Sequence, residues 1–215
     1  MGSHQMTTLS KVAVLLLMAL AFIAPSTVSS YELLDDVWRE TPIAFCVNPS
    51  GIPLGPDGRL LVAHDRFVDM VRAAFQKWED LPTSNVSFTY NGICDGDPSG
   101  SREGRRDGMN TIGWAELRIS TGAQTATRSS SEKTLRDGQY HELLEADIAI
   151  NISSFSTLTD PVQFVWTTLP HVLVHEIGHF IGLGHSNVEC SVMWPSGFRS
   201  EFCKDDFNAV AVLYP

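Results

Sequence analysis

Three histidines and a glutamate near the C-terminus have the types and spacing that could hold a metal ion and activate water. Residues 175–185 read H-E-I-G-H-F-I-G-L-G-H. In a helix, His175 and His179 would lie one above the other, so two imidazole nitrogens could reach one ion. Glu176 is rotated by about 100° from His175, where it would face a water on the open side of the ion. A glycine after the helix would let the chain turn back and bring in His185 as a third ligand.

Three neutral imidazoles with one open coordination place are typical of catalytic zinc, whereas structural zinc sites are closed by four protein ligands. We therefore predict a zinc-activated water with Glu176 as its general base, and hydrolysis of an amide bond. An H-x-x-x-H pair alone would be a weak signal, but the eleven-residue pattern with its glycines is far more specific. His171 shares the helical face of His175; as a fourth ligand it would close the site, so we interpret it as a packing residue or a support for the ligands.

The elements that must position this site follow from hydrophobic periodicity. Apolar residues recur every three or four positions over 65–78 and 204–213, which predicts two amphipathic helices. A further helix, which carries the motif, is expected from about Val162, or from Pro170, to Ile181. Strands are predicted at 43–47, 86–90, 111–115, 121–127 and 146–152, with 121–127 near a sheet edge and 91–110 as a loop. This order indicates an α+β (α/β-like) fold with a mixed sheet.

Composition limits the function classes. The chain has 215 residues, of which 43% are hydrophobic and 19% charged, which fits one domain with a real core. The formal net charge of -10 argues against a nucleic-acid partner, which would favour a basic face. We expect a monomer.

The N-terminus has the pattern of a secretory signal. Lys11 precedes an unbroken apolar run over 12–24, which small residues follow. The run is shorter than the ~20 residues that span a bilayer, although an uncleaved anchor or a buried helix remains the alternative. We assign 1–30 to a signal peptide, with a tag remnant at its start because Met6 offers a second start site, and 31–215 to a catalytic domain. The expected location is secreted or extracellular, or periplasmic in a Gram-negative host, with no membrane anchor after cleavage.

Four cysteines follow this segment: Cys46, Cys94, Cys190 and Cys203. An even count behind a signal peptide favours disulfides, and three pairings are open. We prefer Cys46–Cys94 with Cys190–Cys203, because the second pair closes a short loop; free buried thiols are the alternative. No C-x-x-C spacing occurs, so a cysteine-ligated zinc is not expected.

The motif and the methionine that follows it resemble the metzincins, which are marked by H-E-x-x-H-x-x-G-x-x-H and a methionine turn. The turn corresponds to Ser191–Trp194, where Met193 would form an apolar floor beneath the histidines. Ser186, directly after the third histidine, resembles the matrixins, the family of matrix metalloproteinases. Three more segments are similar to matrixins: F-V-D-M-V-R-A-A-F-Q-K-W-E-D, E-A-D-I-A-I-N and D-D-F-N-A-V-A-V-L-Y-P.

The resemblance covers most of residues 38–215 and implies a metzincin fold, with a twisted mixed sheet of five strands, three helices and a zinc cleft. It implies a zinc endopeptidase that binds extended polypeptide by strand addition beside 121–127. One catalytic zinc is expected, and calcium sites are implied without assigned ligands. The wall of the S1′ pocket, which accepts the residue after the cut, would be formed by Pro195, Ser196, Gly197 and Phe198.

The sequence departs from the matrixin pattern in three places. It contains no P-R-C-G-x-P-D cysteine switch, and no H-x-D…H…H cluster for a second zinc between residues 91 and 150. The two presumed disulfides are not general matrixin features either, so the sequence resembles a minimal form of the family. Two other functions stay open: a catalytically silent secreted zinc-binding module, and a zinc amidase acting on a non-peptide substrate.

Overall fold

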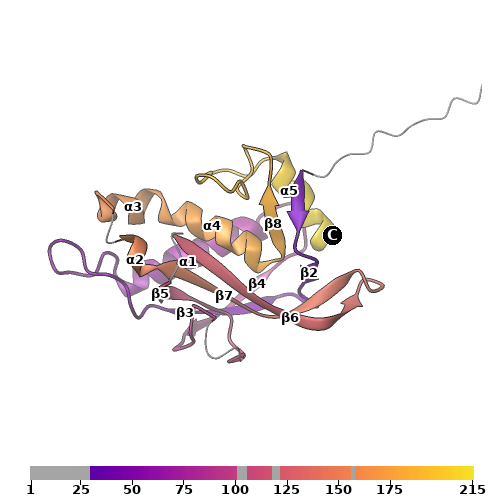
Figure 1. The fold of residues 1–215 in the computed structure, drawn as a ribbon, viewed down its shortest axis with the longest axis horizontal. Coiled ribbons are helices and arrows are strands. Elements are labelled where there is room, and N and C mark those ends of the chain that lie inside the picture. The colour runs from indigo at the N-terminus through magenta and orange to yellow at the C-terminus, as the bar shows by residue number, and fades with distance from the viewer. Residues whose placement is uncertain (1–29, 101–105, 118–121, 156–157) are drawn as a thin grey trace, which may run out of the picture.

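The computed structural model describes residues 30–100, 106–117, 122–155 and 158–215, which form one α+β fold (Figure 1). The helices are α1 His64–Glu79, α2 Ile152–Phe155, α3 Pro161–Thr167, α4 Leu169–Phe180 and α5 Lys204–Leu213. The strands are β1 Tyr31–Leu33, β2 Asp36–Val37, β3 Ile43–Asn48, β4 Phe88–Ile93, β5 Thr111–Ala115, β6 Ala123–Leu135, β7 Tyr140–Asn151 and β8 Leu183–Ser186. The predicted fold class is confirmed.

The main sheet is mostly parallel and is bordered by one antiparallel strand. β4, β3, β5 and β7 are parallel neighbours in that order, and the short β2 runs parallel to the start of β7. β6 runs antiparallel along the other side of β7 and pairs with no other described strand, so it lies at an edge. The edge position predicted for 121–127 is therefore correct for 123–127, whereas residue 121 lies outside the described residues.

The sheet is larger than the five strands that the resemblance implied. Six strands form it among the described residues, and β1 pairs with β8 in a separate two-stranded sheet. β6 and β7 extend far beyond their predicted bounds as a long hairpin that projects from the body of the protein (Figure 1). Most of its side chains over 128–142 are exposed or half-buried, so the sequence there has no apolar alternation to reveal a strand.

Of the two starts left open for the motif helix, about Val162 and Pro170, the structure agrees with the second, because α4 begins at Leu169. A separate helix, α3, precedes it, and Thr168 lies between the two. Pro170 lies in the first turn of α4, where its missing N–H leaves no intrahelical hydrogen bond unmade. α2 and α3 are short helices in addition to the three predicted ones. Both precede the motif helix, which ends within one residue of the predicted Ile181.

α1 and α4 pack side by side on the sheet, and aromatic residues fix their distance from it. Phe75 of α1 stacks on Phe45 of β3 with ring centroids 3.9 Å apart, and meets Phe180 of α4 edge-on at 5.3 Å. The indole Nε1 of buried Trp78 donates to the carbonyl of Val174 at 2.8 Å. α1 therefore supports α4 directly behind its histidines.

The two disulfides have the preferred pairing. Cys46–Cys94 joins β3 to the end of β4, and Cys190–Cys203 closes a loop between residues 13 positions apart. In the chain-entropy account, loops of these lengths correspond to stabilisation of about 4 and about 3 kcal/mol respectively. The second bridge holds both ends of the segment that follows the third histidine.

No helix in the described ranges is both long enough and apolar enough to cross a bilayer. The predicted signal segment lies outside those ranges except for Ser30.

A buried carboxylate in β7 gives the fold a pH dependence. Burial raises the pKa of Asp147 to about 7, and the nearby carboxylates of Glu145, Asp107 and Asp97 add to the effect. Since the unfolded pKa is about 3.9, the folded state binds more protons between these two values, and stability falls as pH rises through that window. We expect Asp147→Asn to raise Tm by roughly 3 °C or more at pH 8, and by clearly less at pH 5.

Differential scanning fluorimetry at the two pH values measures this effect. Asp137→Asn, at an exposed position in the β6–β7 turn, is the matched control and should give the same small change at both. An equal gain from Asp147→Asn at pH 5 and pH 8 would contradict the prediction.

Candidate metal centre and cleft

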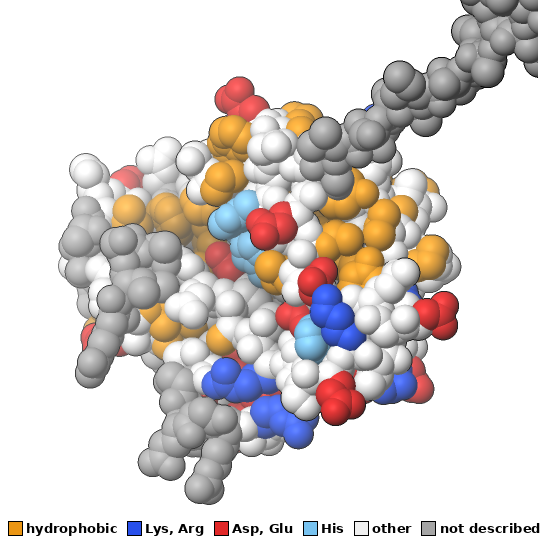
Figure 2. Space-filling model, turned by 45° about the vertical axis from the view of Figure 1, so that its right-hand side comes forward, with side chains coloured by type: hydrophobic (Ala, Val, Ile, Leu, Met, Phe, Trp, Pro, Cys, Tyr) orange, Lys and Arg blue, Asp and Glu red, His pale blue; other side chains and the backbone are white. Residues whose placement is uncertain are grey.

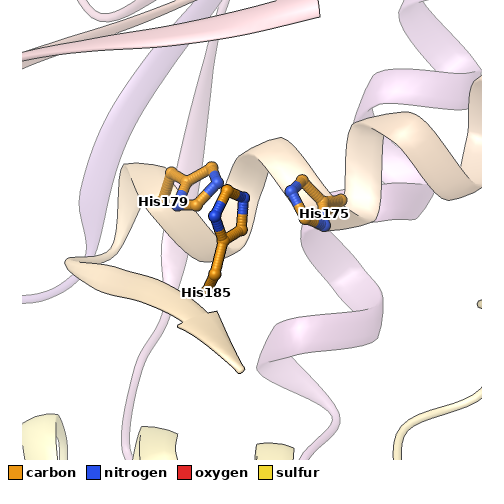
Figure 3. Close-up of side chains that lie close together, drawn as sticks. All are labelled: His175, His179 and His185. Atoms are coloured by element: carbon orange, nitrogen blue, oxygen red, sulfur yellow. The ribbon is translucent and has the colours of Figure 1, made fainter. Parts of the chain in front are cut away.

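α4 and the turn after it bring three histidines together. His175 and His179 stand one turn apart on α4, and His185 returns toward them from β8 (Figure 3). One potential ligand atom from each of the three lies within 4.8 Å of the others. Gly182 makes the reversal possible: its φ is +96°, and a Cβ there would come within 2.2 Å of the carbonyl oxygen of Asp36.

Two of the imidazoles are oriented by backbone carbonyls. Nδ1 of His175 lies 2.7 Å from the carbonyl oxygen of Val192, and Nδ1 of His179 lies 2.7 Å from that of Leu183. With Nδ1–H as the donor in both, each Nε2 keeps its lone pair for a metal ion. Burial lowers the pKa of both rings, that of His179 to about 4, so they are neutral at physiological pH. This donor set fits zinc.

A buried methionine packs against the motif helix α4. Met193 is 2% exposed, and a Cβ on Gly178 would lie only 2.1 Å from its sulfur. Gly178 stands between the two histidines of α4, so its missing side chain is what admits the thioether there.

The turn that carries Met193 is held by the first turn of α5. The carboxylate of Asp206 accepts hydrogen bonds from Ser191 Oγ at 2.6 Å and from the Val192 N–H at 3.2 Å. It also accepts from the N–H of Cys203 at 2.8 Å, where it completes a capping box at the start of α5. The Val192 carbonyl that orients His175 is therefore itself fixed by α5.

Glu176 lies with the histidines in a cleft of about 540 Å³. Its side chain is nearly buried, and burial raises its pKa even though Thr125 donates a hydrogen bond to it. The other residues that line the cleft are Leu34, Gly122, Ala123, Gln124, Thr125, Thr127, Val172, His175, His179, His185, Trp194, Pro195, Gly197 and Phe198. Figure 2 shows a group of pale-blue histidine side chains open to solvent on this face, with hydrophobic side chains beside it.

Three of the four residues predicted for the wall of the S1′ pocket line the cleft. Pro195, Gly197 and Phe198 line the cleft, whereas Ser196 is exposed and does not line it. His171 does not belong to the group of converging ligand atoms among the described residues. The sequence placed Thr125 in an edge strand but did not predict its contact with Glu176. Alternation along the strand turns residues 123, 125 and 127 to the same side, and this pattern was the one sequence signal that pointed to the face of Thr125.

The part of the chain that carries this site is similar to known proteins. Residues 124–215 match the family model described as matrixin. Over 94 residues the chain is 39% identical to Metalloendoproteinase 5-MMP of Arabidopsis thaliana, which covers 42% of this chain and 25% of that protein. It is also 39% identical over 85 residues to Metalloendoproteinase 2-MMP of the same plant, which covers 36% of this chain and 21% of that protein. Matrilysin of Rattus norvegicus is 48% identical over 48 residues, which covers 20% of this chain and 18% of the relative.

The fold and the histidine site are consistent with a matrixin-like metzincin. The part of the chain that is similar to matrixins, 124–215, contains His175, His179 and His185 together with Glu176 and Met193. The chain spans about a quarter or less of the length of each of these three relatives.

Proposed function

We propose that this chain is a secreted zinc-dependent endopeptidase that hydrolyses extended polypeptides. The observation that carries the proposal is the convergence of His175, His179 and His185 beside Glu176 in an open cleft bordered by an edge strand. The similarity to proteins named metalloendoproteinase and matrilysin supports the same reaction.

In this proposal the three histidines hold one zinc ion through their free ring nitrogens. Bound zinc would supply Lewis acidity, which makes water acidic near neutral pH and polarises a carbonyl. The histidines need no deprotonation before they bind, because burial already keeps at least two of them neutral.

In this proposal Glu176 is the general base. Its carboxylate shares the cleft with the histidines and can take a proton from the attacking water and pass it to the leaving amine. β6 has an edge along the cleft with which no other described strand pairs, and an extended peptide could add there as a further strand. Phe198, beside the cleft opening, favours an apolar residue after the cut.

The same proposal assigns 31–215 to a catalytic domain that acts outside the cytoplasm as a monomer, after removal of the segment before it. Two disulfides among the described residues support an oxidising compartment.

Chelation tests the proposed reaction. Incubation with 1,10-phenanthroline is expected to remove essentially all cleavage of a quenched peptide library, and added zinc to restore it, because the ion would be released from three neutral ligands. The isomer 1,7-phenanthroline, which cannot chelate, is the control. Equal signals with both isomers, or zinc at near-unit stoichiometry without any cleavage, would favour the silent binding module. Turnover confined to non-peptide amides would favour the amidase.

A further inference from the structure

The hydroxyl of Thr125 makes the shortest polar contact of Glu176. Thr125 Oγ1 lies 2.6 Å from Glu176 Oε2 and 3.0 Å from the main-chain oxygen of the same residue. A threonine hydroxyl has one hydrogen to donate, and a carboxylate is the stronger acceptor. The hydrogen bond to Oε2 therefore dominates when Glu176 is ionised.

Both partners come from elements that hold them firmly. Thr125 lies opposite Ile148 in the β6–β7 ladder, and its β-branched side chain has few rotamers. Glu176 is 7% exposed on α4, a helix whose buried face packs against β6. The contact thus joins the motif helix to the edge strand on the side of the cleft.

Few other groups fix the orientation of this carboxylate. None of the ion pairs among the described residues involves Glu176. The main-chain N–H of Thr125 also acts on the carboxylate, so both donors come from one residue of β6. Among the described residues, Thr125 is the side chain that donates a hydrogen bond to this carboxylate, and the bond holds Oε2.

We propose that Thr125 is a positioning residue for the general base, whose hydroxyl holds Oε2 of Glu176 so that Oε1 is free to take the proton of the attacking water. This inference rests on the proposed function. It also links two parts of the site, because the strand that would pair with the substrate carries the group that aims the base.

Thr125→Val tests the inference, since valine keeps the shape and β-branching of threonine but removes the hydroxyl. We expect kcat to fall roughly 10- to 100-fold, as for loss of a hydrogen bond to a charged group, with KM within about threefold and zinc content unchanged. Thr125→Ser, which keeps the hydroxyl, is expected to recover most of the rate. Thr134→Val, in an exposed part of the same strand, is the matched control and should leave the rate unchanged.

A double-mutant cycle separates positioning from a general structural effect. In a Glu176→Ala background there is no carboxylate to aim, so Thr125→Val is expected to change the residual rate less than about twofold. The inference is overturned if Thr125→Val keeps the parental kcat, if Thr125→Ser fails to recover the rate, or if the loss follows lowered zinc content. It is also overturned if the loss is as large without the carboxylate as with it. A zinc-loaded parent that cleaves no peptide would instead overturn the proposed function, and the inference with it.

Discussion

Glu176→Gln is expected to lower kcat/KM for peptide cleavage by roughly 100- to 10,000-fold, the range in which a general base contributes, while zinc stays bound. Glutamine has nearly the same shape and can still accept the hydrogen bond from Thr125, but it cannot take a proton from water. The three histidines are untouched, so the metal site should remain intact. Quenched-peptide kinetics together with metal analysis of the same sample measure both quantities.

Glu132→Gln is the matched control, because this exposed carboxylate lies on the projecting hairpin and away from the cleft. It should leave both the rate and the zinc content unchanged. A Glu176→Gln protein that cleaves at the parental rate would exclude Glu176 as the base, even with a full complement of zinc.

His179→Ala is expected to reduce bound zinc from near one ion per chain to a small fraction, and to abolish cleavage. Nδ1 of His179 is anchored to the carbonyl of Leu183, and His179 is one of the three histidines that converge among the described residues and are the proposed zinc ligands. Binding to the native state alone raises stability, so added zinc should raise the Tm of the parent but barely that of the variant. Plasma emission spectrometry after dialysis, with thermal melts at defined zinc concentrations, measures the effect.

His64→Ala provides the matching control, since His64 is exposed at the start of α1 and is not part of the converging group. It should bind zinc as the parent does. If His179→Ala retained one zinc ion per chain and the same zinc-dependent gain in Tm, the three-histidine site would be wrong.

Periodicity predicted the elements that bury one face. The helix over 65–78 corresponds to α1, whose apolar residues are the buried ones, and 43–47 and 111–115 correspond to β3 and β5 almost residue for residue. The elements that were missed have little apolar area to reveal them. β1, β2 and β8 have two to four residues each, and the outer half of the β6–β7 hairpin is solvated. Their positions depend on partners distant in sequence, which a local pattern does not contain.

More of the candidate site than of the surrounding fold could be predicted from the sequence. Local helix geometry determines the spacing of His175 and His179, and a glycine marks the turn to His185. The residues that hold the site side chains in place could not be predicted in the same way. Thr125 reaches Glu176 across 51 positions of sequence, and Asp206 reaches Ser191 across 15. Such contacts form only when strands and helices pack together. Alternation along a strand can indicate the face on which a residue lies, but it does not identify the distant partner.

The carboxylate of Asp206 serves two elements at once, since it begins α5 and fixes the turn whose carbonyl orients His175. Release of α5 would free that carbonyl and allow the imidazole to rotate. In the proposed zinc-bound protein, metal binding and docking of α5 are therefore linked, and each opposes local opening of the other. Removal of zinc would then loosen α5, although none of the three converging histidines lies in that helix.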